Sequence, residues 1–213
     1  MQLVLEWPPY IPLARVASAQ LYYSWDDEDP YGCVAWPDED VKTCLRRVSN
    51  RGVAAYAVGC GEWVLCRLSR HLQNDLPYRY LEVFWALILG ANVLLPPEPA
   101  HEEWRGPVNG PIDLCLSSIL NVFCASAYGP PVQDAALVAQ VANHVLADKW
   151  IFSEWQDRVL SRLAQFAPRS EQNVDGGPVP RQILDPGVDL TRLDAQDLIA
   201  SSLTGLSPVL LRV

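Results

Sequence analysis

Seven carboxylates gather in one short stretch near the N-terminus, where they could attract a cation or a basic partner. The stretch reads WDDEDPYGCVAWPDED, residues 25–40, and contains no Lys or Arg. Carboxylates steer a basic partner from a distance, while rigid aromatic side chains supply the anchors of many protein interfaces. The pattern therefore predicts a partner-binding surface. Its predicted members are Trp25, Asp26, Asp27, Glu28, Asp29, Tyr31, Trp36, Asp38 and Glu39.

A solvated loop leading into a helix is the first alternative interpretation of this stretch. The acids at residues 38–40 suit the positive N-terminal end of the helix that follows. The acids at residues 26–29 fit less well, because four adjacent carboxylates repel one another unless basic groups lie near. Arg46, Arg47 and Arg51 are candidates for that role. Replacing the acids at 26–29 by Asn or Gln is expected to leave the fold intact, whether the stretch is a solvated loop or a binding surface.

A calcium-binding loop is the second alternative. Counted from Asp27, the glycine at position 6 and the acid at position 12 agree with an EF-hand, and these are Gly32 and Asp38. Pro30 and Tyr31 do not agree with that pattern, and no strong helix signal precedes it. We therefore predict no metal site.

Residues suited to catalysis are few. The chain has only three histidines, His71, His101 and His144, and no motif for zinc binding, phosphate cradling or a serine nucleophile. We predict no catalytic residue and no cofactor. The alternative is an enzyme or cofactor-binding protein whose site is assembled across the helices, since such partners need not be adjacent in sequence. Glu62, Cys66 and His71 are the candidate members of that site.

The net charge of −9 lies mostly at one end of the chain. Residues 1–40 contain eight acids and a single base, Arg15, whereas residues 41–213 contain seventeen acids and fifteen bases. Direct binding to nucleic acid is not expected, because contact with phosphates needs a basic face. A basic protein is the better electrostatic match for the acidic end.

Apolar residues recur at helical spacing along most of the chain, and strand signals are weak. We predict an all-α fold, an irregular bundle of about six to eight helices in one domain covering residues 1–213. Residues 1–37 form an irregular acidic N-terminal segment, and residues 168–190 form a long loop rich in Pro and Gly. Helices are predicted for residues 38–52, 53–73, 76–95, 111–128, 132–148, 150–166 and 193–203.

The segment 76–95 is nearly apolar all round after Glu82, which predicts a buried helix at the centre of the bundle. Its apolar run from Val83 to Leu95 is thirteen residues, short of the roughly 20 that span a bilayer. No membrane span is therefore expected, and we predict a cytoplasmic protein. Four cysteines in helical patterns are predicted to be reduced core residues: Cys60, Cys66, Cys115 and Cys124.

The whole profile resembles the immunity proteins that bacteria make beside secreted antibacterial toxins. The tail GPVPRQILDPGVDLTRLDAQDLIASSL, residues 177–203, has the look of bacterial proteins of this kind. The resemblance covers the chain loosely, includes no diagnostic motif and assigns no functional residue. It implies a protein that binds a cognate toxin, basic in many such pairs, and blocks its active site or substrate surface. A scaffold or adaptor subunit is the remaining alternative.

Overall fold

A computed structural model describes residues 7–17, 20–99, 103–125 and 131–190 of the chain. These residues are 61% helix, well above the roughly one-third of an average globular protein, and they contain no strand. The predicted all-α fold is confirmed. The α-helices are α1 Leu13–Val16, α2 Pro30–Cys33, α3 Glu39–Leu45, α4 Asn50–Leu68, α5 Leu76–Ile88, α6 Gly106–Ala125, α7 Val132–Val145 and α8 Lys149–Phe166; the short 3-10 helices are η1 Ser69–His71 and η2 Arg181–Leu184.

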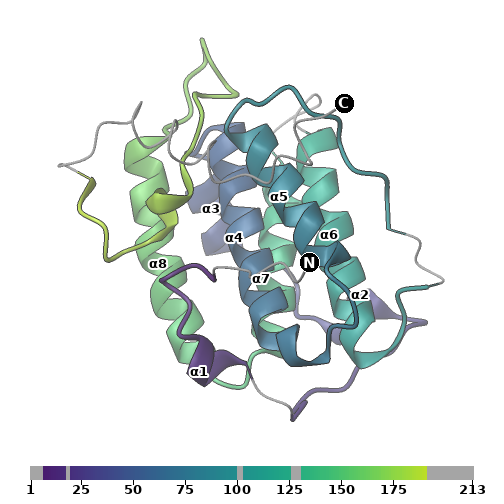
Figure 1. Ribbon diagram of the computed structural model, residues 1–213. Coiled ribbons are helices and arrows are strands. Elements are labelled where there is room, and N and C mark those ends of the chain that lie inside the picture. Colours follow the sequence, from purple (N-terminus) through teal and green to yellow (C-terminus); the bar gives the residue numbers. More distant parts are fainter. Residues whose placement is uncertain (1–6, 18–19, 100–102, 126–130, 191–213) are drawn as a thin grey trace.

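Helix α4 forms the core of the bundle. Every residue of α4 except Arg51 is buried, and the helix packs against α5, α6, α7 and α8. Figure 1 shows α4 between α8 on one side and α5 on the other. A helix that is enclosed on all sides can be apolar all round. Apart from Tyr56, the residues from Val53 to Gly61 are small, which suits this position because small side chains let four neighbouring helices approach.

The prediction that residues 76–95 form the central helix is wrong in two respects. Helix α5 ends at Ile88, and Gly90 follows with a φ of +84°. The helix is also amphipathic, burying Phe84 and Trp85 on one face while the opposite face is partly open to solvent. The apolar run was long because Leu94 and Leu95 continue it in sequence, but both are exposed and lie beyond the helix.

The predicted loop at 168–190 is less open than its composition indicates. It includes η2, and Ile183 and Leu184 of that short helix are completely buried. The Trp155 indole donates a hydrogen bond to the Leu184 carbonyl at 2.9 Å, and Arg162 Nε donates to the Ile183 carbonyl at 2.8 Å. The part of this segment that contains η2 therefore packs against α8. The helix predicted at 193–203 lies outside the described residues.

The six cysteines are all free thiols, and their burial differs. Cys60, Cys66 and Cys115 are buried, as predicted, and burial raises the pKa of each thiol above its ordinary value. The prediction for Cys124 is wrong, because this residue is exposed near the end of α6. It lies on the outer side of the last turn, where apolar periodicity does not distinguish an interior position from a peripheral one.

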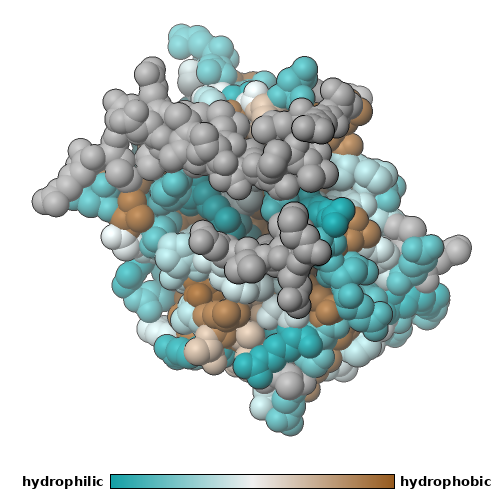
Figure 2. Space-filling model, viewed as in Figure 1, coloured by the Kyte–Doolittle hydropathy of each residue, from teal (hydrophilic) through white to brown (hydrophobic). Residues whose placement is uncertain are grey.

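One described helix, α6, is long and apolar enough to cross a membrane by length and composition alone. Half of that window is buried inside the bundle, and the core helix of a globular protein can pass the same test of length and composition. On the face seen in Figure 2, hydrophilic surface predominates between separate hydrophobic patches. Scattered apolar patches of this kind are normal on protein surfaces.

Candidate partner-binding surface

The residues that lead into the acidic segment, defined here as residues 25–40, are tied to the bundle by two long-range contacts. The buried guanidinium of Arg67 on α4 donates to the Val145 carbonyl at 3.0 Å and to the Gln20 carbonyl. On α7, His144 Nε2 lies 2.9 Å from the Ser24 carbonyl oxygen. Helices α4 and α7 therefore position the chain as it enters the acidic segment.

Tyr23 supplies a hydrogen bond that the proline inside helix α6 cannot make. The sequence predicts that this helix begins at Pro111, but it begins at Gly106, so that Pro111 lies inside it. Pro111 has no N–H to donate to the Pro107 carbonyl four residues earlier. The hydroxyl of Tyr23 donates to that carbonyl instead, and burial raises the pKa of Tyr23 to about 12. A side chain of the N-terminal segment thus completes the first turn of α6.

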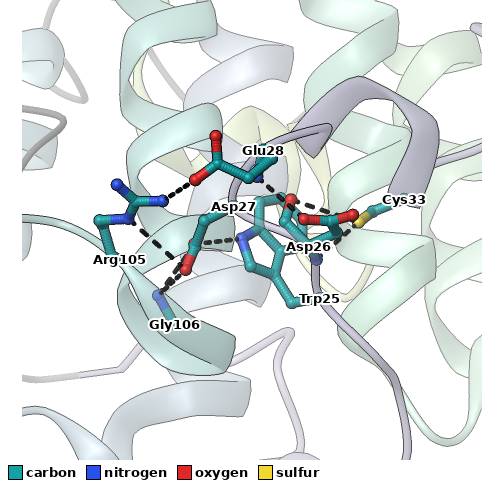
Figure 3. Close-up of polar contacts among 7 residues, drawn as sticks. All are labelled: Trp25, Asp26, Asp27, Glu28, Cys33, Arg105 and Gly106. Atoms are coloured by element: carbon teal, nitrogen blue, oxygen red, sulfur yellow. Dashed lines mark hydrogen bonds and ion pairs between the residues drawn. The ribbon is translucent and has the colours of Figure 1, made fainter.

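Asp27 caps the same helix end. Its two carboxylate oxygens each lie 2.9 Å from the Gly106 backbone nitrogen, and Oδ1 also accepts from the Trp25 indole at 3.0 Å (Figure 3). Gly106 has a φ of +87°, which only glycine adopts readily. A Cβ on Gly110 would lie 2.0 Å from Trp25 Nε1, so the indole packs directly on the α6 backbone. Asp27 and Trp25 therefore fasten the acidic segment to α6.

Three further aspartates satisfy backbone N–H groups of the segment itself. Asp26 accepts from the Glu28 amide at 2.9 Å, and Asp29 accepts from the Gly32 amide at 3.0 Å, which caps α2. Asp38 accepts from the Asp40 amide at 2.7 Å and caps α3. The helix-cap role that the sequence indicates for Asp38 is thus present. The expectation that all four acids at 26–29 are dispensable for folding disagrees with the contacts of Asp27 and Asp29.

The two glutamates of the acidic segment form ion pairs at the surface. Glu28 pairs with Arg105, and Glu39 pairs with Lys42 and, at 3.7 Å, with Arg46. The hydrogen bond from Lys42 lowers the pKa of Glu39. Arg46, Arg47 and Arg51 were the candidates for compensating the acids at 26–29, but Arg46 pairs with Glu39 instead. The cation that pairs with Asp27 and Glu28 is Arg105, which the sequence did not indicate. Seven carboxylates and three paired cations leave this surface a formal balance of −4.

Two aromatic residues of the acidic segment project into solvent. Trp36 is 91% exposed and Tyr31 is 64% exposed, whereas Trp25 is half-buried against α6. Neither Trp36 nor Tyr31 has a ring partner among the aromatic pairs of the described residues. A tryptophan this exposed contributes little packing to the core. The structure thus brings exposed aromatics and exposed acids together on one ordered segment.

A pocket of about 240 Å³ lies between this segment and α6, and we call it the α2–α6 pocket. Figure 3 shows three residues of its wall, Trp25, Asp27 and Arg105. Among the other lining residues, Ser117 has a buried hydroxyl without a hydrogen-bond partner in the described part of the chain. Asp113 also lines the pocket, and its charge adds to burial in raising the pKa of Tyr80 nearby. The lining residues are far apart in sequence, so no local sequence pattern predicts the pocket.

The alternative site of Glu62, Cys66 and His71 has a different character. Both carboxylate oxygens of Glu62 are occupied, Oε2 by the Tyr10 hydroxyl and Oε1 by the Trp85 indole at 2.7 Å and Arg181 Nη2 at 2.5 Å. Burial raises the pKa of Cys66 to about 12, so the thiolate is scarce at neutral pH. Glu62 therefore ties α4 to the N-terminal segment, α5 and η2, and its contacts in the described part of the chain do not include His71.

The residues of the EF-hand pattern do not converge. Asp27 turns to the start of α6, Asp29 to the α2 amide of Gly32, and Asp38 to the start of α3. Within the described residues, no group of three or more His, Cys, Asp or Glu side chains is arranged to hold a metal ion. The carboxylates of this stretch instead serve helix ends and solvent.

Comparison with models of protein families, with curated proteins and with solved structures gave no match for this chain. The interpretation of the site therefore depends on its geometry, its charge and its aromatic residues.

Proposed function

We propose that the protein binds a basic partner protein through the acidic segment and neutralises it, in the manner of an immunity protein and its cognate toxin. The observation that supports this proposal is the position of Trp36, 91% exposed on an ordered segment among carboxylates. Exposed tryptophan is costly to leave in water, and it is one of the residue types that dominate binding hot spots. On this proposal the protein acts in the cytoplasm of the cell that makes the partner.

The carboxylates divide into two roles under this proposal. Asp27, Asp29 and Asp38 hold the segment in shape through their backbone contacts. Glu28 and Asp40 are exposed and supply charge to the surface. A surface that is already ordered loses little conformational entropy on binding, which favours affinity. The negative balance steers a basic partner toward the aromatic anchors and raises the association rate.

A pull-down from the native organism, followed by mass spectrometry, identifies the partner. Surface plasmon resonance at two salt concentrations then separates the roles of charge and anchor. The double variant Glu28→Gln, Asp40→Asn is expected to slow association and flatten its salt dependence, because steering by exposed charges is screened within about 8 Å at physiological salt. Trp36→Ala is expected to speed dissociation, equivalent to roughly 2 kcal/mol for a hot spot.

Trp150→Ala is the matched control for the anchor. Trp150 is 74% exposed, but it lies at the start of α8 and outside the acidic segment. Its replacement is expected to leave both rates unchanged. If Trp36→Ala and the charge variant bind the isolated partner as the parent protein does, the acidic segment is a solvated loop and the interface lies elsewhere.

A further inference from the structure

The outer face of α3 carries opposite charges at its two ends. The helix packs against α7 and α8 and buries Val41 and Leu45 on its inner face. On its outer face, Asp40, Thr43 and Arg47 are exposed at a spacing of three and four residues, which places them in one row. Asp40 lies in the first turn and Arg47 just past the last, about 10 Å apart along the helix axis. The small side chain of Thr43 between them leaves room for another surface to approach.

The side chains of Asp40 and Arg47 are both available to a partner. Neither has an ion pair or a side-chain hydrogen bond within the part of the chain that the structure describes. Their neighbours are already engaged, since Glu39 is held by Lys42 and lies 3.7 Å from Arg46. A helix face with a free carboxylate at one end and a free guanidinium at the other is complementary to a second copy of itself in the antiparallel orientation.

A groove of about 720 Å³ adjoins the basic end of α3, and we call it the α3–α8 groove. Three arginines and one carboxylate, Glu171, are among its lining residues, which gives the lining a formal balance of +2. Backbone hydrogen bonds fix its shape: the Arg169 amide donates to the Arg47 carbonyl at 2.9 Å, beside a bridge between Val48 and Pro168. Arg47 and Arg169 therefore lie directly opposite each other. Like charges in that arrangement destabilise a fold, so these arginines are not explained by folding alone.

The α3–α8 groove is suited to an indole ring. Pro168 and the 38% exposed Val174 supply apolar contact, and the planar guanidinium groups of arginine stack on aromatic rings. Arg169 donates from Nη1 to the Asn50 side chain at 3.2 Å, which leaves the face of its guanidinium open for stacking. Trp36, which is 91% exposed, lies two residues before the N-cap of α3 and thus at the acidic end of the helix. An antiparallel second copy therefore brings its own tryptophan to the end of α3 where the groove lies.

We infer that two copies of this chain associate through antiparallel α3 helices, with Asp40 of each copy against Arg47 of the other and Trp36 of each copy in the other's α3–α8 groove. The contact is the same on both copies, so it closes as a twofold dimer. A seven-residue helix and one tryptophan from each copy bury less than the roughly 1,200–2,000 Å² of a stable interface, so the dimer dissociates on dilution. The inference goes beyond the proposed function: the dimer covers Trp36 and Asp40, and a basic partner has to displace the second copy.

Analytical ultracentrifugation of the full chain, from micromolar to millimolar concentration, tests the charged contact. The parent protein is expected to dimerise reversibly, and less at high salt, because exposed pairs are screened. Asp40→Arg and Arg47→Asp are each expected to weaken dimerisation at least about 10-fold, since each variant places like charges opposite one another twice per dimer. An equimolar mixture of the two variants is expected to dimerise as the parent does. In the mixed dimer the introduced arginine of one chain faces the introduced aspartate of the other, and the remaining Arg47 faces the remaining Asp40.

Two further variants test the contact between the indole and the groove. Trp36→Ala is expected to weaken dimerisation at least about 10-fold, because the ring that fills the groove is removed from both copies. Val174→Asp places a charge in the groove at an exposed position and is expected to have an effect of similar size. Trp150→Ala is the matched control, since Trp150 is exposed at the start of α8 and lines no part of the α3–α8 groove. It is expected to dimerise as the parent does. Circular dichroism checks the fold of each variant.

The inference is overturned if the parent protein sediments as a monomer at millimolar concentration, or if the charge variants each dimerise as the parent does. It is also overturned if their mixture stays monomeric while both variants are folded, or if Trp36→Ala and Val174→Asp leave dimerisation unchanged. None of these measurements includes a partner protein. A monomeric chain would therefore remove the dimer and leave the proposed function to be judged on the purified partner, at concentrations too low for dimerisation.

Discussion

Two regions of this molecule combine carboxylates with arginine and tryptophan, and they use the combination differently. In the core, the Glu62 side chain is 3% exposed, and its oxygens are occupied by Tyr10, Trp85 and Arg181. In the acidic segment, several carboxylates cap backbone N–H groups while others face solvent beside Trp36. The same residue types therefore stabilise the fold in one place and remain available to a partner in the other.

The two regions differ in whether their carboxylates have protein groups or water as partners, and not in residue type. A buried carboxylate must have partners, because an unpaired charge in the core is very costly. An exposed carboxylate has water as its partner and can exchange that water for a basic group. Variants in the core are thus expected to change stability, and variants on the exposed face are expected to change binding.

The largest effects on stability are expected at Glu62 and at its hydrogen-bond partner Trp85. Glu62→Ala leaves the Trp85 indole, the Tyr10 hydroxyl and Arg181 without their acceptor, and the cost of breaking a buried pair is about 3–5 kcal/mol. Because the Arg181 side chain is 40% exposed and can find water, we expect the lower end of that range. Urea unfolding measures the change.

Glu154→Ala is the control for this prediction, since Glu154 pairs with Arg158 on the exposed face of α8. That change is expected to cost less than about 1 kcal/mol, as surface pairs do. Equal losses in the two variants would contradict the view that Glu62 is the polar tie of the core. Trp85→Asp is expected to be at least as damaging as Glu62→Ala, because it brings a second carboxylate against Glu62.

Alkaline pH is expected to weaken the fold through several buried groups together. Burial raises the pKa of Cys66 from 9.0 to about 12 and that of Tyr23 from 10.0 to about 12, and it also raises those of Tyr10, Tyr56 and Cys60. Each folded-state pKa exceeds its unfolded value, so the stability these groups contribute is complete below about pH 9 and is lost as pH rises through 12.

The free energy of unfolding should therefore fall between pH 9 and 12, as measured by urea unfolding at each pH. Tyr23→Phe should reduce the fall, since that variant has one fewer group to ionise. A free energy that stays constant over this range would show that these side chains are not buried as the structure places them.

The sequence predicts the helices and the acidic segment, but it does not predict features that depend on tertiary packing. Helical periodicity is a local property, so α3 to α8 could be anticipated from their apolar spacing. The central position of α4 could not, because it depends on how small residues let neighbours approach. Pro111 indicated a helix start because its missing N–H is normally tolerated only there, and the Tyr23 hydroxyl that compensates comes from far along the chain. The acidic segment is contiguous and was visible, whereas Asp113 and Ser117 reach its pocket only through tertiary packing.

A moderate effect is expected within the acidic segment itself. Asp27→Ala removes the acceptor of the Gly106 amide and the Trp25 indole, and loss of a cap costs about 0.5–2 kcal/mol. Asp40→Ala is the matched control, because Asp40 is exposed and its replacement should stay within about 0.5 kcal/mol. Thermal unfolding followed by circular dichroism distinguishes the two. If both variants melt with the parent protein, the contacts of Asp27 do not stabilise the fold, and all seven acids become equal candidates for binding.

The smallest effect on stability is expected at Trp36, and this is where the comparison of the two regions becomes sharpest. Trp36 is 91% exposed and has no ring partner in the described residues, so Trp36→Ala should change the free energy of unfolding by less than about 0.5 kcal/mol. Trp85 is a core residue and is 5% exposed, so Trp85→Ala should lower the free energy of unfolding by about 3–5 kcal/mol. Urea unfolding of both variants gives the two values. A large loss at Trp36 would mean that the side chain packs against part of the protein, and it would then belong to the fold and not to the surface that meets a partner.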